Sequence, residues 1–196
     1  MMRPAHALPP ILLMASLLAT ACASHSAEPA LSSSEYMGED RVETAARLLA
    51  IAADSQDSAD ARHMRAVSVL TRLGVRADEG EEDIVAEWSA SLPADSSPPM
   101  RGRLLGPAYR SGTLPPGKSI STEQLFEGGR QAQVSISGKN HAPLRVMIQD
   151  RRNNNVCDPA PGNPRNCRWT PAYSSRYEIT VSNPGDQPVT YFLVIG

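Results

Sequence analysis

Hydrophobic residues repeat with a helical period between residues 35 and 92. In the first stretch, about residues 35–54, apolar side chains recur every three or four positions and share one helix face: Val42, Ala45, Ala46, Leu49 and Ala53. A second stretch covers residues 58–73, and a third begins behind the acidic turn Glu81–Asp83 and ends before Pro93. The pattern predicts a three-helix unit over residues 35–92.

From about residue 119 the hydrophobic period changes to two, as in half-buried strands. Three stretches alternate in this way, with inward positions Ala132, Val134 and Ile136, then Leu144, Val146 and Ile148, then Tyr177, Ile179 and Val181. Residues 189–195 are apolar on both faces, as expected for a central strand. Turn residues such as Asn183–Asp186 separate the stretches. Residues 119–196 are therefore predicted to form an antiparallel β-sandwich.

Residues 93–118 join these two regions and are rich in proline and glycine, which predicts a linker and lead-in. The expected fold is of the α+β class, with a small N-terminal helical module and a C-terminal sandwich as separate modules. A helical unit of this size is marginally stable alone, so we expect it to pack on the sandwich or on a partner.

The first 22 residues have the layout of a secretory signal. Arg3 precedes an apolar run over residues 11–18, which is too short to remain as a membrane-spanning helix. The small residues before Cys22 resemble a bacterial lipobox, in which that cysteine receives diacylglycerol and an N-acyl chain. We therefore expect a signal peptide over residues 1–21, lipid on Cys22, and a tether over residues 22–34.

A second interpretation of this segment stays open. Ala21 and its neighbours also satisfy the small-residue rule of the ordinary signal peptidase, which would release a secreted protein. In similar lipoproteins an aspartate after the cysteine retains the protein at the inner membrane, and Ala23 stands there instead. The prediction is an envelope lipoprotein at the outer membrane, facing the periplasm or the surface, with secretion as the alternative.

The two remaining cysteines, Cys157 and Cys167, form an even pair in a chain predicted to leave the cytoplasm. Such a pair is typical of a disulfide. A metal site would need further ligands, and His141 has no second histidine near it. We predict a disulfide and no metal.

The net charge of −2 hides a split between the two halves of the chain. Residues 28–95 hold 15 acidic side chains and six arginines, whereas residues 101–196 hold six acidic and 12 basic ones. The balance is −9 against +6. This asymmetry predicts that the halves attract each other or that one of them meets a charged partner outside the chain.

The sequence from Cys157 through Cys167-Arg168-Trp169-Thr170-Pro171, followed by Arg176–Asn183 and Tyr191–Val194, resembles bacterial pre-peptidase C-terminal domains. The resemblance covers about residues 105–196. It implies a jelly-roll-like β-sandwich that is non-catalytic and associated with polymer binding or secretion. Such domains often carry an acidic Asp-x-Asp-Leu strand that contributes to a calcium site. Here the equivalent strand, Pro143–Ile148, lacks acidic residues, and no calcium is expected.

Catalytic patterns are absent from the sequence. The histidines lack partners at ligand spacing, and neither a Gly-x-Ser-x-Gly elbow nor a phosphate-binding glycine loop occurs. We expect no enzyme activity, no cofactor and no nucleic-acid binding. The predicted function is a non-catalytic binding or assembly module for an envelope protein or an anionic polymer. The alternative is an accessory or regulatory subunit of a separate envelope enzyme.

The candidate binding residues lie in the C-terminal half. Four arginines are expected to form a basic face: Arg151, Arg152, Arg165 and Arg168. Trp169 and Tyr173 are a candidate aromatic platform for sugars or peptide, with core packing as the alternative for Trp169.

Overall fold

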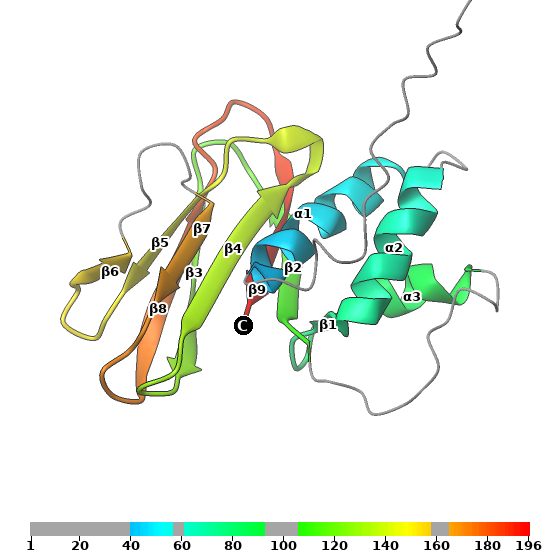
Figure 1. Cartoon of the computed structure of the whole chain (residues 1–196). Coiled ribbons are helices and arrows are strands. Elements are labelled where there is room, and N and C mark those ends of the chain that lie inside the picture. Colours follow the sequence, from blue (N-terminus) through cyan, green and yellow to red (C-terminus); the bar gives the residue numbers. More distant parts are fainter. Residues whose placement is uncertain (1–39, 57–60, 93–105, 158–164) are drawn as a thin grey trace, which may run out of the picture. The chain divides into compact units, whose positions relative to one another are not determined.

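A computed structural model describes residues 40–56, 61–92, 106–157 and 165–196. The predicted signal peptide, Cys22 and the tether lie outside the described residues. The described part of the chain contains three α-helices on one side of two β-sheets (Figure 1). None of the helices described there is long and apolar enough to span a bilayer.

The helices are α1 (Arg41–Asp54), α2 (Ala61–Leu73) and α3 (Ile84–Ala90), which confirms the three predicted from periodicity. Helix α1 carries many alanines and is buried on several sides, because their small side chains let neighbours approach closely. Gly74 follows α2 with a positive φ of 70°, a conformation that suits glycine at a helix end. Asp83 precedes α3 and caps its N-terminus, where its carboxylate accepts a hydrogen bond from Ala86 N.

Sheet A has five strands in the order β1 (Arg76–Ala77), β2 (Ala108–Leu114), β9 (Val189–Ile195), β4 (Ala132–Gly138) and β7 (Asn166–Trp169). Sheet B has four strands in the order β3 (Ser119–Phe126), β8 (Ser175–Ser182), β5 (Arg145–Gln149) and β6 (Asn155–Cys157). All pairs are antiparallel except β1 with β2. A short 3₁₀ helix, η3 (Lys139–His141), follows β4.

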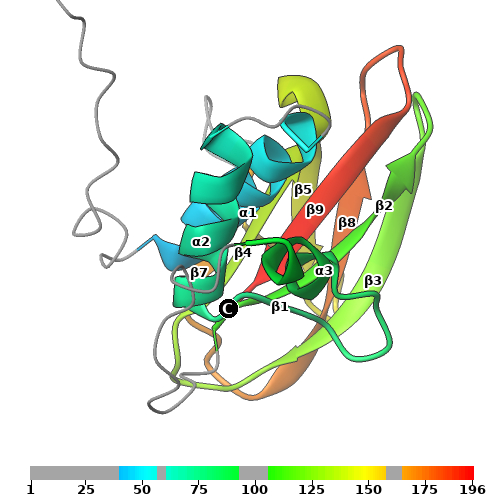
Figure 2. The same cartoon turned by 90° about the vertical axis from the view of Figure 1, so that its right-hand side faces the viewer.

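Sheet A is the middle layer of the molecule. Residues of β9 alternate between two cores: Tyr191 and Leu193 contact sheet B, while Phe192 and Val194 contact the helices. Figure 2 shows α1 lying across β4 and β9 on the helical side. The sequence predicted a central strand here because β9 is apolar on both faces. Both faces are indeed buried, one by the helices and one by sheet B.

Two predictions about the organisation are wrong. The helices pack on the sandwich, as expected for so small a unit, but they are not a separate module, because they share one hydrophobic core with Tyr109, Phe192 and Val194 of sheet A. The predicted linker is too long, because β2 lies within residues 93–118. Strand β2 lacks a clear period of two in part because Gly112 leaves room for Tyr191, whose ring would lie 3.1 Å from an added Cβ.

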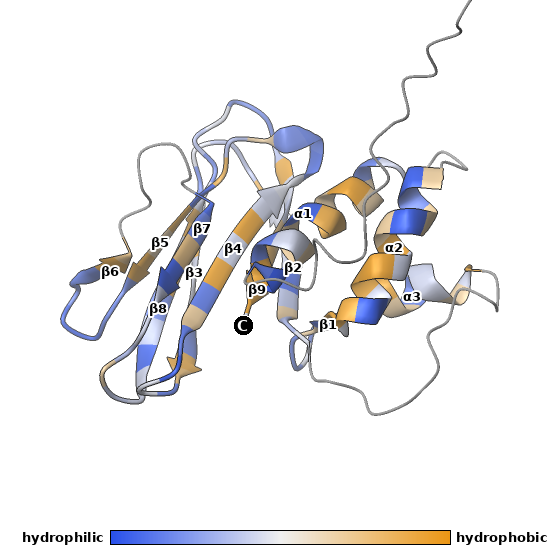
Figure 3. Cartoon of the chain, viewed as in Figure 1, coloured by the Kyte–Doolittle hydropathy of each residue, from blue (hydrophilic) through white to orange (hydrophobic). Residues whose placement is uncertain are grey.

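The β-sandwich itself is confirmed by two facing sheets with a common core. Its jelly-roll-like connectivity stays a prediction. Figure 3 shows hydrophobic residues along β4 and β9 and a hydrophilic turn between β5 and β6. That turn lies on the side of the sandwich away from the helices (Figure 1).

Candidate binding surface

The predicted disulfide is present between Cys157 on β6 and Cys167 on β7, with a Cα–Cα distance of 5.8 Å. Strand β6 is an outer strand of sheet B and β7 an outer strand of sheet A. The bond therefore joins the two sheets along one side of the sandwich.

Arg168, one of the four predicted binding arginines, is used within the fold. Its guanidinium forms an ion pair with Asp40, the residue that precedes α1. Two positions earlier, the side-chain amide of Asn166 donates to a carboxylate oxygen of Glu43 at 2.7 Å. Strand β7 thus contacts the acidic first turn of α1, and part of the charge split between the halves is satisfied inside the molecule.

Arg165 also lies near other parts of the fold. One of its Nη atoms lies 3.4 Å from the carbonyl oxygen of His141, at the long limit of a hydrogen bond. The opposite end of α1 is held nearby, where the Asp54 carboxylate accepts two contacts of 2.9 and 3.1 Å from Asn140 N. Arg165 and Arg168 therefore lie along the junction between sheet A and the helical layer.

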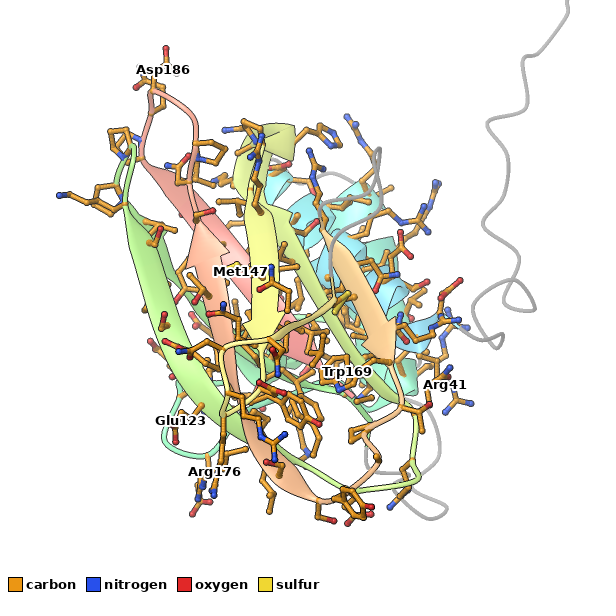
Figure 4. All side chains as sticks on the ribbon, turned by 90° about the vertical axis from the view of Figure 1, so that its left-hand side faces the viewer. Arg41, Glu123, Met147, Trp169, Arg176 and Asp186 are labelled. Atoms are coloured by element: carbon orange, nitrogen blue, oxygen red, sulfur yellow. A yellow bond between two sulfur atoms is a disulfide. The ribbon has the colours of Figure 1, made fainter. Side chains whose placement is uncertain are left out.

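Trp169 is partly buried and packs against the core between the sheets, which agrees with the alternative considered for it. Its ring packs edge-on against Phe126, with centroids 4.7 Å apart, and against Tyr177 at 5.5 Å. Figure 4 shows Trp169 between the sheets, whereas Met147 lies on the outer face of sheet B. Tyr173 is 83% exposed in the turn between β7 and β8, so the structure gives the two proposed platform residues very different environments.

Arg151 and Arg152 stand apart from the other two arginines, on the turn between β5 and β6, and both are exposed. The preceding Asp150 organises this turn. Its Oδ1 accepts from Arg152 N at 2.8 Å and from Asn154 N at 2.9 Å, and its Oδ2 accepts from Asn154 Nδ2 at 2.9 Å. Asn153 completes the turn with a φ of 60°, a conformation that asparagine tolerates better than most residues.

These hydrogen bonds stabilise the charged form of the Asp150 carboxylate. The side chain and backbone of Asn154 are the main causes, and they lower the pKa of Asp150 from its usual 3.8. At neutral pH the turn is therefore held by an ionised carboxylate with both oxygens occupied. The structure does not bring the four arginines together as one face; it presents one pair at the turn and keeps the other pair at the helical junction.

Asp150 was missed as a site residue by the sequence analysis. The signal that could have found it is an aspartate followed by several turn-forming residues, since aspartate side chains commonly bond to backbone N–H groups a few residues ahead. Within the described ranges, no group of three histidine, cysteine or acidic side chains could hold a metal ion.

This chain is similar to several solved structures at low sequence identity. No family model and no curated protein matches it. Among solved structures, Aeromonas hydrophila PliG, a periplasmic inhibitor of g-type lysozyme, has a TM-score of 0.38 at 14% identity and covers 46% of this chain and 84% of its own. The pre-peptidase C-terminal domain of Bacillus anthracis collagenase has the same TM-score at 15% identity, with 45% and 87% covered. Salmonella Typhimurium PliG has a TM-score of 0.33 at 17% identity, with 45% and 88% covered.

Proposed function

We propose that the protein is a non-catalytic binding module of the bacterial envelope, anchored by lipid on Cys22, and that its β5–β6 turn binds an anionic envelope polymer. The observation that carries the proposal is the set of hydrogen bonds from Asp150, which fix the turn around Arg151 and Arg152. Figure 1 shows this turn at the far side of the sandwich from the helices.

A fixed turn favours binding because less conformational entropy is lost when a partner docks. Guanidinium groups suit such a partner, since each can donate two parallel hydrogen bonds to a carboxylate or phosphate. Arg151 and Arg152 are adjacent and exposed, and Asn154 and Asn155 beside them are exposed as well. The turn therefore offers two cations and amide donors at one tip.

The contacts of Arg165 and Arg168 favour a site at this turn over the predicted face of four arginines. Arg168 already neutralises Asp40, and Arg165 lies against the His141 carbonyl. A partner that used them would have to compete with contacts between sheet A and the helical layer. The turn can be occupied without disturbing any of those contacts.

The binding test compares two double variants of the full-length protein on lipopolysaccharide vesicles and on peptidoglycan sacculi. Arg151→Glu with Arg152→Glu should weaken binding by about ten-fold or more at low salt, because two charge-assisted contacts become repulsive. Arg145→Glu with Arg176→Glu makes the same charge change on exposed strand positions and should bind within about two-fold of the unaltered protein. Equal losses in both variants would contradict a site at the turn.

The anchor is tested separately. Cys22→Ser should leave an unprocessed or a soluble form of the protein, because the thiol that receives lipid is gone. A variant that still partitions into detergent at the mature size would contradict lipidation. The alternative function, an accessory subunit of an envelope enzyme, would be indicated by an enzyme that co-purifies with the protein from solubilised envelope and is lost with Arg151→Glu and Arg152→Glu.

A further inference from the structure

Strand β3 is an edge of sheet B and the longest edge strand in the described part of the chain. It has eight residues, whereas β1, β6 and β7, which end the other sheet edges, have two, three and four. The β6 and β7 edges are also joined by the disulfide. Figure 4 shows β3 along the free side of the sandwich, with Glu123 on it.

Edge strands usually carry features that prevent pairing with another chain, such as proline, lysine or a bulge. Strand β3, with the sequence Ser-Ile-Ser-Thr-Glu-Gln-Leu-Phe, contains neither proline nor lysine and has one charged residue, Glu123, and it pairs with β8 in an unbroken register. Ile120 is 44% exposed and Leu125 is 55% exposed, so two large apolar side chains lie along this edge.

The ladder with β8 fixes which backbone groups of β3 point outward. Asn183 N donates to Lys118 O at 3.0 Å, and these two residues are opposite each other in the register that continues from Ser119 and Ser182. Hydrogen-bonded pairs alternate along an antiparallel ladder. The even-numbered residues from 120 to 126 therefore bond to β8, and the odd-numbered residues present their N–H and C=O groups to the free edge: Ser119, Ser121, Glu123 and Leu125.

These outward groups remain available for a partner. The described residues place one side chain near them, the amide of Gln124, which lies 3.5 Å from the Leu125 carbonyl at the limit of a hydrogen bond. Water satisfies such groups in a monomer, but a second strand satisfies them as well and covers Ile120 and Leu125 at the same time.

We propose that two copies of this chain pair through β3, antiparallel, to form one continuous eight-stranded sheet from their two B sheets. The proposal is independent of the polymer-binding function. A two-fold axis normal to the sheet would relate the copies, so that each contributes the same surface, as in most homodimers.

The strand itself selects the register. The two cores stay on the same side of the joined sheet only if each residue meets one of the same parity, since a one-residue slip exchanges the faces. Centring the axis on Thr122 pairs all outward residues of both copies, with Ser119 opposite Leu125 and Ser121 opposite Glu123. A shift that centred the axis on Glu123 would place like charges directly opposite each other, which is unfavourable.

This register makes a specific prediction for cross-linking in the full-length protein in the envelope. Thr122 would face itself across the axis in a pair without mutual hydrogen bonds, where Cα atoms are about 4.5 Å apart, a distance that a disulfide can span. Thr122→Cys should therefore give a disulfide-linked dimer on a non-reducing gel. Ser121→Cys, one position away, should not, because it would face Glu123.

A second pair of substitutions tests the backbone contact. Ser121→Pro removes an outward N–H without touching the β8 ladder and should lower the Thr122→Cys cross-link by about ten-fold, because one hydrogen bond is lost in each half of the symmetric pair. Ser121→Ala keeps the N–H and should cross-link like the parent. Equal cross-linking of both variants would overturn the proposal.

Sedimentation equilibrium of the unaltered full-length protein in density-matched detergent measures its oligomeric state without any substitution. The proposal requires a dimer that dissociates on dilution. A monomer at about 100 μM, or a Thr122→Cys adduct whose mass shows a different protein as the partner, would overturn it.

Discussion

The hydroxyl group of Tyr109 on β2 donates to the carboxylate of Asp83, the residue that caps the N-terminus of α3, with 3.1 Å between Oη and Oδ1. Tyr109 Oη also accepts a hydrogen bond from the backbone N–H of Val85, at 3.2 Å. Tyr109 is fully buried, and burial is the main cause that raises its pKa above the usual value. One side chain of sheet A thus satisfies the first turn of α3 and fixes that helix to the sheet.

Tyr109→Phe should lower the free energy of unfolding by about 1–3 kcal/mol, because the Val85 N–H loses its buried acceptor. Chemical denaturation followed by circular dichroism measures the change. Tyr173→Phe is the matched control: it removes the same oxygen from an 83% exposed side chain and should shift stability by less than about 0.5 kcal/mol. Equal effects of the two variants would contradict the role given to Tyr109.

The sandwich should not fold alone. A fragment of residues 106–196 would expose the helical side of sheet A, including Phe192 and Val194, which are almost fully buried in the intact chain. Exposed apolar patches of this kind lead to association or to loosely packed states. We expect the fragment to aggregate or to bind a hydrophobic dye strongly. A monomeric fragment with a cooperative unfolding transition like that of the full chain would show that the two regions are separate modules after all.

The turn at Asp150 should lose its order in acid. The pKa of this carboxylate is lower in the folded protein than its usual 3.8, so its stabilising effect is fully present above that value and is lost as the pH falls through the folded pKa. Proton NMR of the Asn154 side-chain amide can follow the change. Its signals should stay constant above pH 5 and shift below 3.8, and Asp150→Asn should abolish the titration. A transition near neutral pH would contradict the assignment.

Periodicity predicted the elements that bury one clear face. The three helices and strands β4, β5, β8 and β9 correspond to apolar repeats in the sequence. Strand β2 was missed because Gly112 interrupts its pattern, and β1 has only two residues, too few to show a period. Packing of the helices on the sandwich was one of two expected outcomes, but the residues that join them could not be predicted from local pattern, because Tyr109 and Phe192 face partners far away in the sequence.

The candidate site divides in the same way. The disulfide followed from an even pair of cysteines in a chain predicted to leave the cytoplasm, and the exposure of Arg151 and Arg152 agrees with their predicted part in a basic surface. The separation of Arg168 from Arg151 could not, since it arises from the pairing of β7 with β4 and from the contact of β7 with the start of α1. Charge counts along the chain show an excess of one sign of charge, but they do not show which oppositely charged side chains already form ion pairs within the fold.

The most direct test of the account is the affinity of Asp150→Ala for lipopolysaccharide and peptidoglycan. This substitution removes a negative charge beside Arg151 and Arg152, so attraction by net charge alone would strengthen binding to an anionic polymer. It also removes three hydrogen bonds that hold the turn in shape. If the fixed shape of the turn is what binds, affinity must fall despite the added positive charge, by about five-fold or more, with the fold unchanged by circular dichroism. Binding that is unchanged or tighter would contradict the central claim.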